Sequence, residues 1–254
     1  MVLNRLGNKA RISKEIIKHF PPHKTYIELF FGAGGLFFNK PLADYNFLND
    51  IDDDVFNLWI VLQQDKEELI KQFSLMPISE TLLKHWAINK ETDPIKKAIR
   101  FLMLSNFGYM GKPETLCYGQ SYGNQKKSTL SSIEGTVLFL KNCQFMCQDF
   151  RKVFPKIQFR KNKKDAFIYA DPPYLNTTNN YKNSFSEADV IDLFRILVNS
   201  EIRFAYSEFD NPFILERAKK YNLNIIEIGT RQAMKAKKKE VLITNYNSPQ
   251  LTLF

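Results

Sequence analysis

The sequence has few of the residues that build disulfide frameworks or zinc sites. Its 254 residues include only three cysteines and three histidines. The cysteine count is odd, no C-x-x-C pair occurs, and the histidines do not cluster with the cysteines at metal-ligand spacing. We therefore predict a cytoplasmic protein with reduced cysteines, no structural zinc and no other bound metal.

Long apolar runs and an excess of acidic residues are also missing. The segment up to Ile17 is polar and basic, and no stretch is apolar enough to span a bilayer, so we expect neither a signal peptide nor membrane association. Lys and Arg number 36 against 27 Asp and Glu, a net charge of +9. This excess favours an anionic partner such as nucleic acid, with a merely soluble basic protein as the alternative.

The first part of the chain has the pattern of an α/β sheet. A hydrophobic content of 44% is enough for one sizeable domain, or for a core domain with one large insertion. Residues 25–30 read as a buried strand that ends in the glycine-rich run 32–35, and a short helix follows through Phe37 and Phe38. A second strand at 46–48 then completes the opening of a doubly wound sheet.

The middle of the chain has a different pattern. Apolar residues recur at three- and four-residue steps between 54 and 104, which predicts helices. Residues 106–127 are polar and rich in Gly and Tyr, and we interpret them as a long loop.

Strand patterns return in the last part of the chain. We predict further strands at 144–146, 166–170, 202–206, 223–228 and 240–246, with a helix at 187–198 and another between the strands at 202–206 and 223–228. The α/β core is therefore predicted to comprise residues 1–53 and 144–254, and residues 54–143 form a largely helical insertion.

The first group of candidate site residues is the run 28–34 together with Asp50. Glycines after a first strand let the backbone approach a ligand, and an acidic residue about twenty positions later suits ribose hydroxyls. Phe37 stands where a dinucleotide fingerprint has its third glycine, which weakens a nicotinamide interpretation and favours a smaller adenosine-type ligand. The alternative is a plain glycine turn with Asp50 as a helix cap.

The second group is Asp171-Pro172-Pro173-Tyr174, directly after an apolar strand. The prolines fix the backbone and remove two donors, while their carbonyls still accept hydrogen bonds. Asp171 and the Pro172 carbonyl can each accept one hydrogen of a planar amino group, and Tyr174 can stack on its ring. The alternative is a structural turn.

The third group is Asp149-Phe150, which follows the strand at 144–146. A carboxylate and an aromatic ring could bind the amino group and the face of an adenine. For this dipeptide alone, helix capping by Asp149 is the stronger alternative.

In their order and combination, these motifs resemble those of the Dam-type, alpha-group adenine-specific DNA methyltransferases. Gly7-Asn8-Lys9 is similar to the family's G-x-K motif, and residues 181–186 and 204–208 resemble its later segments. The resemblance spans nearly the whole chain. It implies a Rossmann-like S-adenosylmethionine-dependent core, with residues 54–143 as an inserted helical DNA-recognition domain.

The resemblance also assigns roles to individual residues. It implies that Asp171, Pro172, Pro173 and Tyr174 hold the target base. Arg5 replaces an aromatic that is usual in the family, and we expect it to reach the cofactor carboxylate. The other implied contacts to S-adenosylmethionine come from Lys9, Phe30, Gly32, Gly34, Asp50, Asp149, Phe150 and Asp171.

The implied reaction is methyl transfer to the exocyclic amino group of an adenine flipped out of double-stranded DNA. Alignment of donor and acceptor supplies most of the catalysis, and Asp171 stabilises the positive charge that develops on the amine. The alternatives are methylation of RNA or of a protein glutamine, and a catalytically idle DNA-binding module.

Basic and aromatic residues in the two predicted loops, 106–127 and 229–239, are the candidates for DNA contact. Solvated surface is the alternative. We expect a monomer, and whether a companion restriction endonuclease exists stays open, as does the recognition sequence. The candidate DNA-binding residues are Tyr109, Lys112, Lys126, Lys127, Arg231, Lys237 and Lys238.

Overall fold

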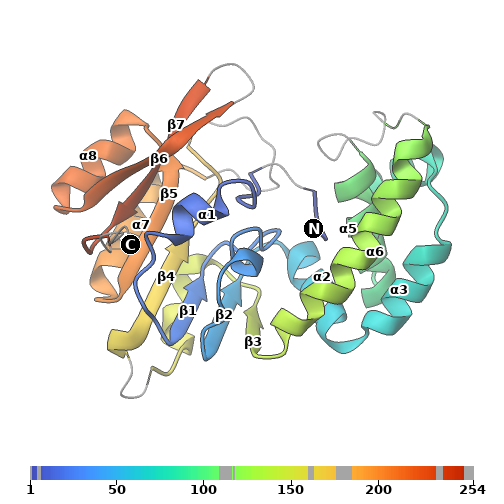
Figure 1. The fold of residues 1–254 in the computed structure, drawn as a ribbon, viewed down its shortest axis with the longest axis horizontal. Coiled ribbons are helices and arrows are strands. Elements are labelled where there is room, and N and C mark those ends of the chain that lie inside the picture. Colours follow the sequence, from blue (N-terminus) through green and yellow to red (C-terminus); the bar gives the residue numbers. More distant parts are fainter. Residues whose placement is uncertain are drawn as a thin grey trace, which may run out of the picture.

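The fold is built on a seven-stranded sheet with the order β3-β2-β1-β4-β5-β7-β6 (Figure 1). The structure is a computed structural model that describes residues 2–4, 7–108, 116, 118–159, 163–175, 185–232 and 237–248. β7 runs antiparallel to both of its neighbours, and the other pairings are parallel. The strands are β1 (Thr25–Glu28), β2 (Tyr45–Asn49), β3 (Cys143–Met146), β4 (Ala166–Ala170), β5 (Arg203–Phe209), β6 (Asn224–Gln232) and β7 (Lys237–Thr244).

The two central strands are buried on both faces, as is usual in parallel sheets that helices cover on both sides. Every residue of β1 and β4 is buried. α7 (Glu187–Asn199) and α8 (Pro212–Lys220) contribute to the apolar cluster on one face of the sheet. The N-terminal segment with α1 (Ser13–Ile17), the short helix η1 (Phe37–Asn39) and α2 (Asp53–Gln64) contribute to the cluster on the other.

A helical insertion between β2 and β3 lies to one side of the sheet (Figure 1). Its first helix joins it to the sheet, because Leu58, Trp59 and Leu62 belong to the same buried cluster as Phe31 and Leu48. Sheet and insertion therefore share one continuous core. The helices are α2, α3 (Lys66–Leu75), α4 (Glu80–Ile88), α5 (Pro94–Phe107) and α6 (Gln120–Leu140).

A buried ion pair holds three of these helices together. Arg100 on α5 pairs with Asp54 on α2 at 3.3 Å, and both side chains are less than a tenth exposed. The Arg100 Nε also donates to the carbonyls of Trp86 and Asn89 at the end of α4, at 2.8 and 3.0 Å. These contacts satisfy a guanidinium that would otherwise be costly to bury.

The mainly parallel α/β sheet with helices inserted after its second strand confirms the predicted fold class. None of the helices in the described residues has the length and apolar character that a membrane span needs.

The predicted loop at 106–127 is wrong over its last part. α5 extends to Phe107 and α6 begins at Gln120, so Lys126 and Lys127 are helical. Residues 109–115 and Cys117 lie outside the described residues. The sequence pattern did not indicate this helix, because its inward-facing positions include Tyr122 and Thr129 and not a regular series of aliphatic residues.

The predicted loop at 229–239 is also wrong at both ends. β6 continues to Gln232 and β7 starts at Lys237, so the basic residues on either side lie in a β-hairpin. Charged residues are tolerated there because opposite charges pair across the strands, as Lys239 does with Glu227 at 3.2 Å. Arg231, Lys237 and Lys238 are therefore strand residues.

Lys126 is engaged inside the helical insertion. Its Nζ donates to the main-chain carbonyls of Ser74 and Met76 at 2.8 and 2.6 Å. These carbonyls lie at the C-terminal end of α3, where a cation is favoured by the helix dipole. Burial lowers the pKa of Lys126. This lysine therefore ties α6 to α3, which argues against its predicted contact with DNA.

We predict that Lys126→Gln destabilises the protein by about 1–3 kcal/mol, because it removes charge-assisted hydrogen bonds to two carbonyls. The neighbouring Lys127 is exposed on α6 and provides the matched control. Lys127→Gln should change the free energy of unfolding by less than about 0.5 kcal/mol. Urea unfolding followed by circular dichroism measures both. Equal stabilities for the two variants would contradict the role assigned to Lys126.

Candidate active site

The candidate residues meet at one edge of the sheet, where the parallel strands end. Hydrogen bonds continue past the ends of the strands and draw the following segments together. Leu29 N donates to the Tyr169 carbonyl at 3.2 Å, and Asp50 N donates to the Met146 carbonyl at 3.2 Å. The glycine run, Asp50, the 147–150 segment and the tetrapeptide after β4 therefore lie side by side, at the usual ligand-binding edge of such sheets.

Asp50 shapes the glycine-rich loop. One carboxylate oxygen accepts the amide of Gly32 at 2.7 Å, and the other accepts the amide of Asp52 at 2.9 Å. Trp59 on α2 donates its indole N–H to the Gly32 carbonyl at 3.1 Å. The helix cap of α2 is Asp52, so the alternative that Asp50 caps this helix is wrong.

The three glycines of this loop differ in what surrounds the position of a Cβ atom. Gly32 has φ +51°, and no atom lies within 4 Å of where its Cβ would be. At Gly34 a Cβ would lie 2.4 Å from the Phe38 ring. At Gly35 it would lie 1.7 Å from the Oδ1 of Asn8. The N-terminal motif is therefore seated directly on the glycine loop, and Gly32 is the glycine with open space beside it.

Asn49 is a buried residue that the sequence analysis did not assign to the site. Its side-chain amide donates to the carbonyls of Leu29 and Gln148, at 3.0 and 2.9 Å. It thereby fixes the segments that follow β1 and β3. A buried asparagine at the end of an apolar strand was the available indication, because a buried amide needs partners.

Asp149 caps the short helix η3 (Phe150–Lys152), as the alternative interpretation of this dipeptide proposed. Its carboxylate accepts the amide of Arg151 at 2.8 Å and pairs with the Arg151 guanidinium at 3.1 Å. The same guanidinium pairs with Asp189 and Asp192 on α7, at 2.6 and 2.7 Å. Asp149 is about one-third exposed, so it also remains accessible at the edge.

Three phenylalanines form a cluster beside Asp149. The ring centroids of Phe30 and Phe150 are 5.5 Å apart, and Phe185 lies 5.7 and 5.9 Å from them. Phe150 is buried, whereas Phe30 and Phe185 are half-buried. The cluster is an apolar, aromatic surface next to the glycine loop.

The tetrapeptide after β4 is bound to the N-terminal motif. The Lys9 Nζ lies 2.6 Å from an Asp171 oxygen, 3.4 Å from a Glu240 oxygen and 4.5 Å from the centre of the Tyr174 ring. The Tyr174 hydroxyl donates to Glu240 at 2.5 Å, and Phe209 packs edge-on against the Tyr174 ring at 4.6 Å. Burial, reinforced by Asp171 and Glu240, raises the pKa of Tyr174 well above its usual value.

Residues 6–236 match the family model of the D12 class N6 adenine-specific DNA methyltransferases. The chain belongs to this family. The family decides between the predicted activity on DNA adenine and the alternatives on RNA or protein glutamine, in favour of DNA. The chain is an adenine-specific DNA methyltransferase.

Curated relatives of this methyltransferase agree with the family. It is 25% identical to the DNA adenine methylase of Escherichia coli over 242 residues, which cover 87% of this chain and 85% of that one. It is 31% identical over 185 residues to the DNA adenine methylase of Haemophilus influenzae, covering 66% and 61% of the two chains. It is 24% identical to the Type II methyltransferase M.FokI of Planomicrobium okeanokoites, with 97% of this chain and 43% of that one covered.

The methyltransferase also has a distant likeness to a solved structure. An rRNA methylase from Streptococcus thermophilus aligns over 91% of this chain and 92% of its own, with 6% identity and a TM-score of 0.39. This similarity is too low to support a conclusion of its own.

Several predicted site residues of the methyltransferase fall outside what the structure describes. Arg5, Tyr109 and Lys112 lie outside the described residues, and the side chains of Arg231 and Lys237 are not described either. Lys238 is half-buried, with its Nζ 5.2 Å from the centre of the Phe209 ring.

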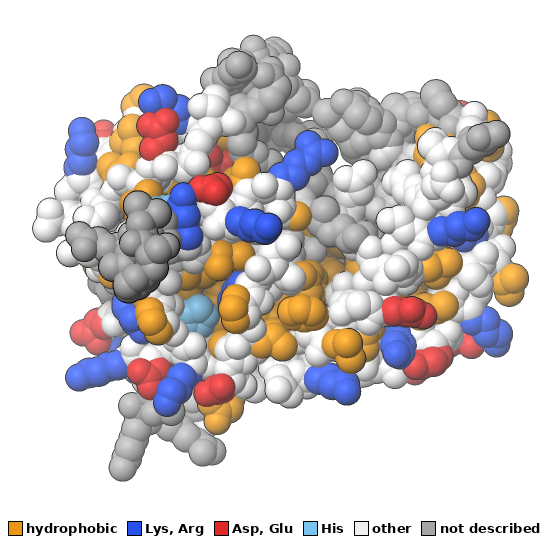
Figure 2. Space-filling view, in the orientation of Figure 1, with side chains coloured by type: hydrophobic (Ala, Val, Ile, Leu, Met, Phe, Trp, Pro, Cys, Tyr) orange, Lys and Arg blue, Asp and Glu red, His pale blue; other side chains and the backbone are white. Residues whose placement is uncertain are grey.

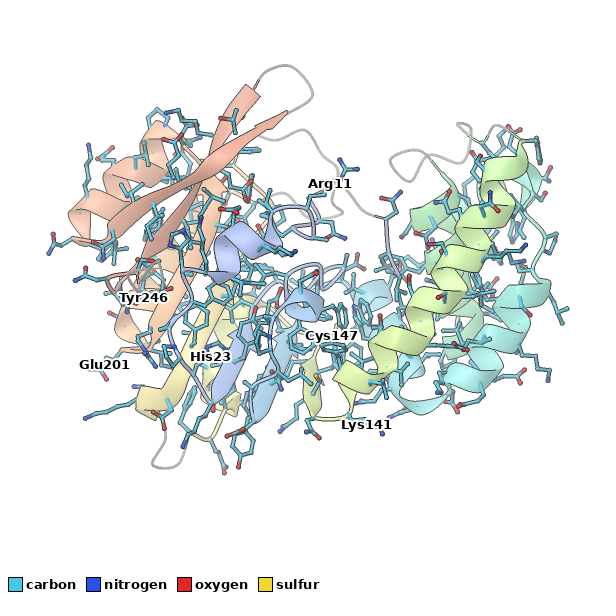
Figure 3. The ribbon with its side chains drawn as sticks, viewed as in Figure 1. Arg11, His23, Lys141, Cys147, Glu201 and Tyr246 are labelled. Carbon is cyan, nitrogen blue, oxygen red and sulfur yellow. The ribbon has the colours of Figure 1, made fainter. Side chains whose placement is uncertain are left out.

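An exposed arginine lies close to Lys9 in the sequence. Arg11 is labelled in Figure 3, on the side where the β6–β7 hairpin projects. On the face drawn in Figure 2, the described Lys and Arg side chains are interspersed with Asp and Glu. The positive net charge is therefore not gathered into one patch on that face.

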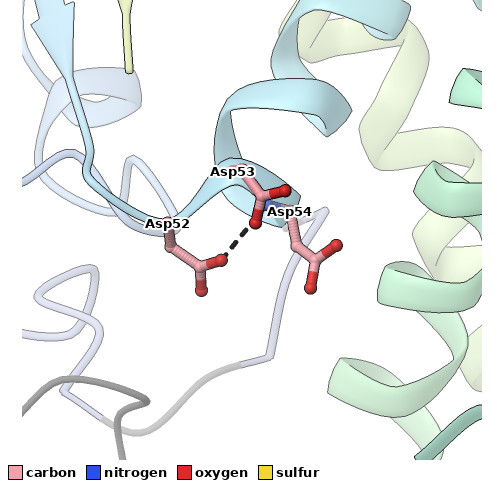
Figure 4. Close-up of side chains that lie close together, drawn as sticks. All are labelled: Asp52, Asp53 and Asp54. Atoms are coloured by element: carbon pink, nitrogen blue, oxygen red, sulfur yellow. Dashed lines mark hydrogen bonds between the residues drawn. The ribbon is translucent and has the colours of Figure 1, made fainter. Parts of the chain in front are cut away.

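Asp52, Asp53 and Asp54 form an acidic group at the start of α2 of the methyltransferase (Figure 4). Asp52 accepts the amide of Asp54 at 3.1 Å as the N-cap of the helix. Asp53 pairs with Lys97 at 2.8 Å, and Asp54 pairs with the buried Arg100. Capping and ion pairing account for all three carboxylates without a metal ion.

Two further carboxyl groups lie buried near the strand ends. Glu28 accepts the Tyr26 hydroxyl at 2.7 Å, and Glu208 accepts the amides of Phe209 and Leu175 at 2.9 and 3.3 Å. Burial raises the pKa of each to about 8, although these hydrogen bonds act in the opposite direction. Both are therefore mainly protonated at neutral pH.

We predict that the raised pKa of Glu28 makes stability depend on pH. A folded-state pKa above the unfolded value of 4.5 gives stability that is complete below 4.5 and is lost as pH rises through about 8. Glu28→Gln should remove part of this slope, because the amide stays neutral. Urea unfolding between about pH 5 and about pH 9 measures it, with Glu227→Gln on the exposed face of β6 as control. A wild-type slope in Glu28→Gln would refute the assignment.

Proposed function

We propose that the edge formed by the glycine loop, Asp149-Phe150 and the tetrapeptide binds S-adenosylmethionine and an adenine flipped out of duplex DNA. The main support for this proposal is the ion pair between the Nζ of Lys9 and a carboxylate oxygen of Asp171, 2.6 Å apart. It joins the motif expected at the cofactor to the motif expected at the target amine. Methyl transfer requires these two groups to be adjacent.

The residues at this edge fit S-adenosylmethionine. The open space beside Gly32 allows close approach of a ligand to the backbone. Asp50 holds the amides of Gly32 and Asp52, and a carboxylate at the end of the second strand suits the ribose hydroxyls. Phe30 is half-buried and, packed against the buried Phe150, offers an aromatic surface to adenine. We assign the cofactor to Lys9, Phe30, Gly32, Asp50, Asp149, Phe150 and Asp171, with Gly34 acting through the packing of the loop.

The tetrapeptide would hold the target adenine. When bound, S-adenosylmethionine supplies a methyl group that is already activated on a sulfonium. Asp171 and the Pro172 carbonyl each accept one hydrogen of the amino group, which turns the nitrogen lone pair toward the donor. Pro173 keeps the segment rigid, and Tyr174 stacks on the base. The charge of Asp171 stabilises the positive charge that develops on the nitrogen.

We propose the helical insertion, residues 54–143, as the part that recognises DNA, and the β6–β7 hairpin as a second contact. Side chains alternate along β7, so Lys238 lies on the same face as Glu240. Its position over Phe209, which packs on Tyr174, places it beside the tetrapeptide. Lys239 points the other way and pairs with Glu227. Arg11 and Lys127 are further exposed cations for the phosphates.

Asp171→Asn tests the proposed function. It keeps the size of the side chain but removes the charge, so we expect methyl transfer to fall by more than about a hundredfold with the fold intact. Incorporation of tritiated methyl groups into unmethylated genomic DNA measures it. Asp53→Asn, which removes an exposed carboxylate paired with Lys97, is the control and should retain activity. Normal turnover in the folded Asp171→Asn variant would refute the assignment.

Lys238→Gln and Lys239→Gln test the DNA contact of the hairpin. If Lys238 neutralises a phosphate, its loss should flatten the dependence of log affinity on log salt by about 0.9. Lys239→Gln should leave the slope unchanged, because Glu227 already pairs with that lysine. Fluorescence anisotropy with one duplex over a range of salt gives both slopes. Equal slopes for Lys238→Gln and the wild type would show that Lys238 does not contact a phosphate.

A further inference from the structure

Glu240 is a fully buried carboxylate that no motif of the sequence singles out. It lies on β7, where its Cα is paired with Phe209 of β5 on one side and with Gly229 of β6 on the other. Its exposure is 0%. A carboxylate in this position is retained only if charged or hydrogen-bonding partners compensate for the loss of water.

The partners of Glu240 are site residues from two distant segments. Its Oε1 accepts the hydroxyl of Tyr174 at 2.5 Å and lies 3.4 Å from the Nζ of Lys9. One carboxylate thus connects the antiparallel hairpin with the tetrapeptide after β4 and with the N-terminal motif. A hydrogen bond from a hydroxyl to a charged acceptor is short and strong, so it fixes the orientation of the Tyr174 ring.

Glu240 also changes the charge balance around Asp171. Lys9 faces two carboxylates, Asp171 at 2.6 Å and Glu240 at 3.4 Å, so its positive charge is shared between them. Without Glu240, more of the positive charge of Lys9 would be directed at Asp171. The reaction develops positive charge on the adenine amine beside Asp171, and the negative charge of Asp171 stabilises it.

We propose that Glu240 is a positioning residue for methyl transfer. It orients Tyr174 through the hydroxyl and shares the ammonium of Lys9, so that Asp171 keeps its negative character toward the amine. It acts through these residues and does not itself touch the adenine. The inference rests on the proposed role of residues 171–174 in holding the target base.

Glu240→Gln tests the inference, because the amide keeps the shape and can still accept the Tyr174 hydroxyl but lacks the charge. The matched control is Glu227→Gln on the same hairpin, whose carboxylate pairs with Lys239 at 3.2 Å and is 56% exposed. Single-turnover transfer of tritiated methyl groups to unmethylated genomic DNA gives the rate, calorimetry gives the affinity for S-adenosylmethionine, and thermal melting reports the fold.

We expect Glu240→Gln to lower the single-turnover rate at saturation by about tenfold to a hundredfold, the effect of losing a charge-assisted interaction. Affinity for the cofactor and half-saturation by DNA should stay within about threefold, and Glu227→Gln should behave as wild type. A rate within about twofold of wild type in Glu240→Gln would overturn the inference. So would a loss confined to cofactor or DNA binding, with a normal rate at saturation.

Tyr174→Phe examines the same contact from the other side. It keeps the ring and removes the hydroxyl, so a wild-type rate would overturn the role of this hydrogen bond even if Glu240→Gln fails to fold. In the double variant, the two losses should combine to less than their product, because Glu240→Gln weakens the hydrogen bond that Tyr174→Phe removes. Asp171→Asn separates the outcomes: if it is inactive while Glu240→Gln is normal, the proposed function stands and this inference falls.

Discussion

The pairing of Lys9 with Asp171 and Glu240 is the constraint around which the rest of the site is arranged. Lys9 is 3% exposed, and an ammonium at that depth requires carboxylates within reach. The N-terminal segment must therefore cross the carboxyl ends of the strands. That path brings Asn8 against Gly35, where a Cβ would overlap the Asn8 side chain. The identity of one glycine in the loop thus follows from the burial of one lysine.

The glycine loop is also linked to the helical insertion, through hydrogen bonds to Gly32. Trp59 is fully buried in the shared core and donates to the carbonyl of Gly32, while Asp50 holds the Gly32 amide. Gly32 is therefore held at its carbonyl by Trp59 of α2 and at its amide by Asp50, which directly follows β2. Because of the hydrogen bond from Trp59, a movement of the insertion relative to the sheet would displace this indole and, with it, the glycine loop.

Much of this arrangement could be predicted from the sequence because its determinants are local. The run from Ala166 to Ala170, followed by Asp-Pro-Pro-Tyr, specifies a buried strand and a rigid turn within a few residues. The glycine run and Asp50 are likewise read from neighbouring strands. Since parallel strands end at one edge, motifs that directly follow such strands lie close together there.

The parts that the sequence did not indicate depend on contacts between distant segments. Glu240 was predicted only as the first residue of the last strand, and its partners are 66 and 231 positions away. Lys126 was predicted to contact DNA from a polar loop, whereas its ammonium binds carbonyls at the end of α3, about fifty residues earlier. The sequence around a charged residue does not show whether its side chain is buried. For both residues, burial depends on partners that are distant in the sequence.

The carboxyl groups near this edge differ in their partners. Glu28 and Glu208 accept hydrogen bonds from a tyrosine hydroxyl or from backbone amides, and burial raises the pKa of each to about 8. Asp171 and Glu240 instead share the ammonium of Lys9, at 2.6 and 3.4 Å. Asp171 further raises the pKa of Glu28 by repulsion between like charges. Lys9 therefore forms ion pairs with the two carboxylates at the tetrapeptide, whereas Glu28 and Glu208 accept hydrogen bonds from uncharged donors.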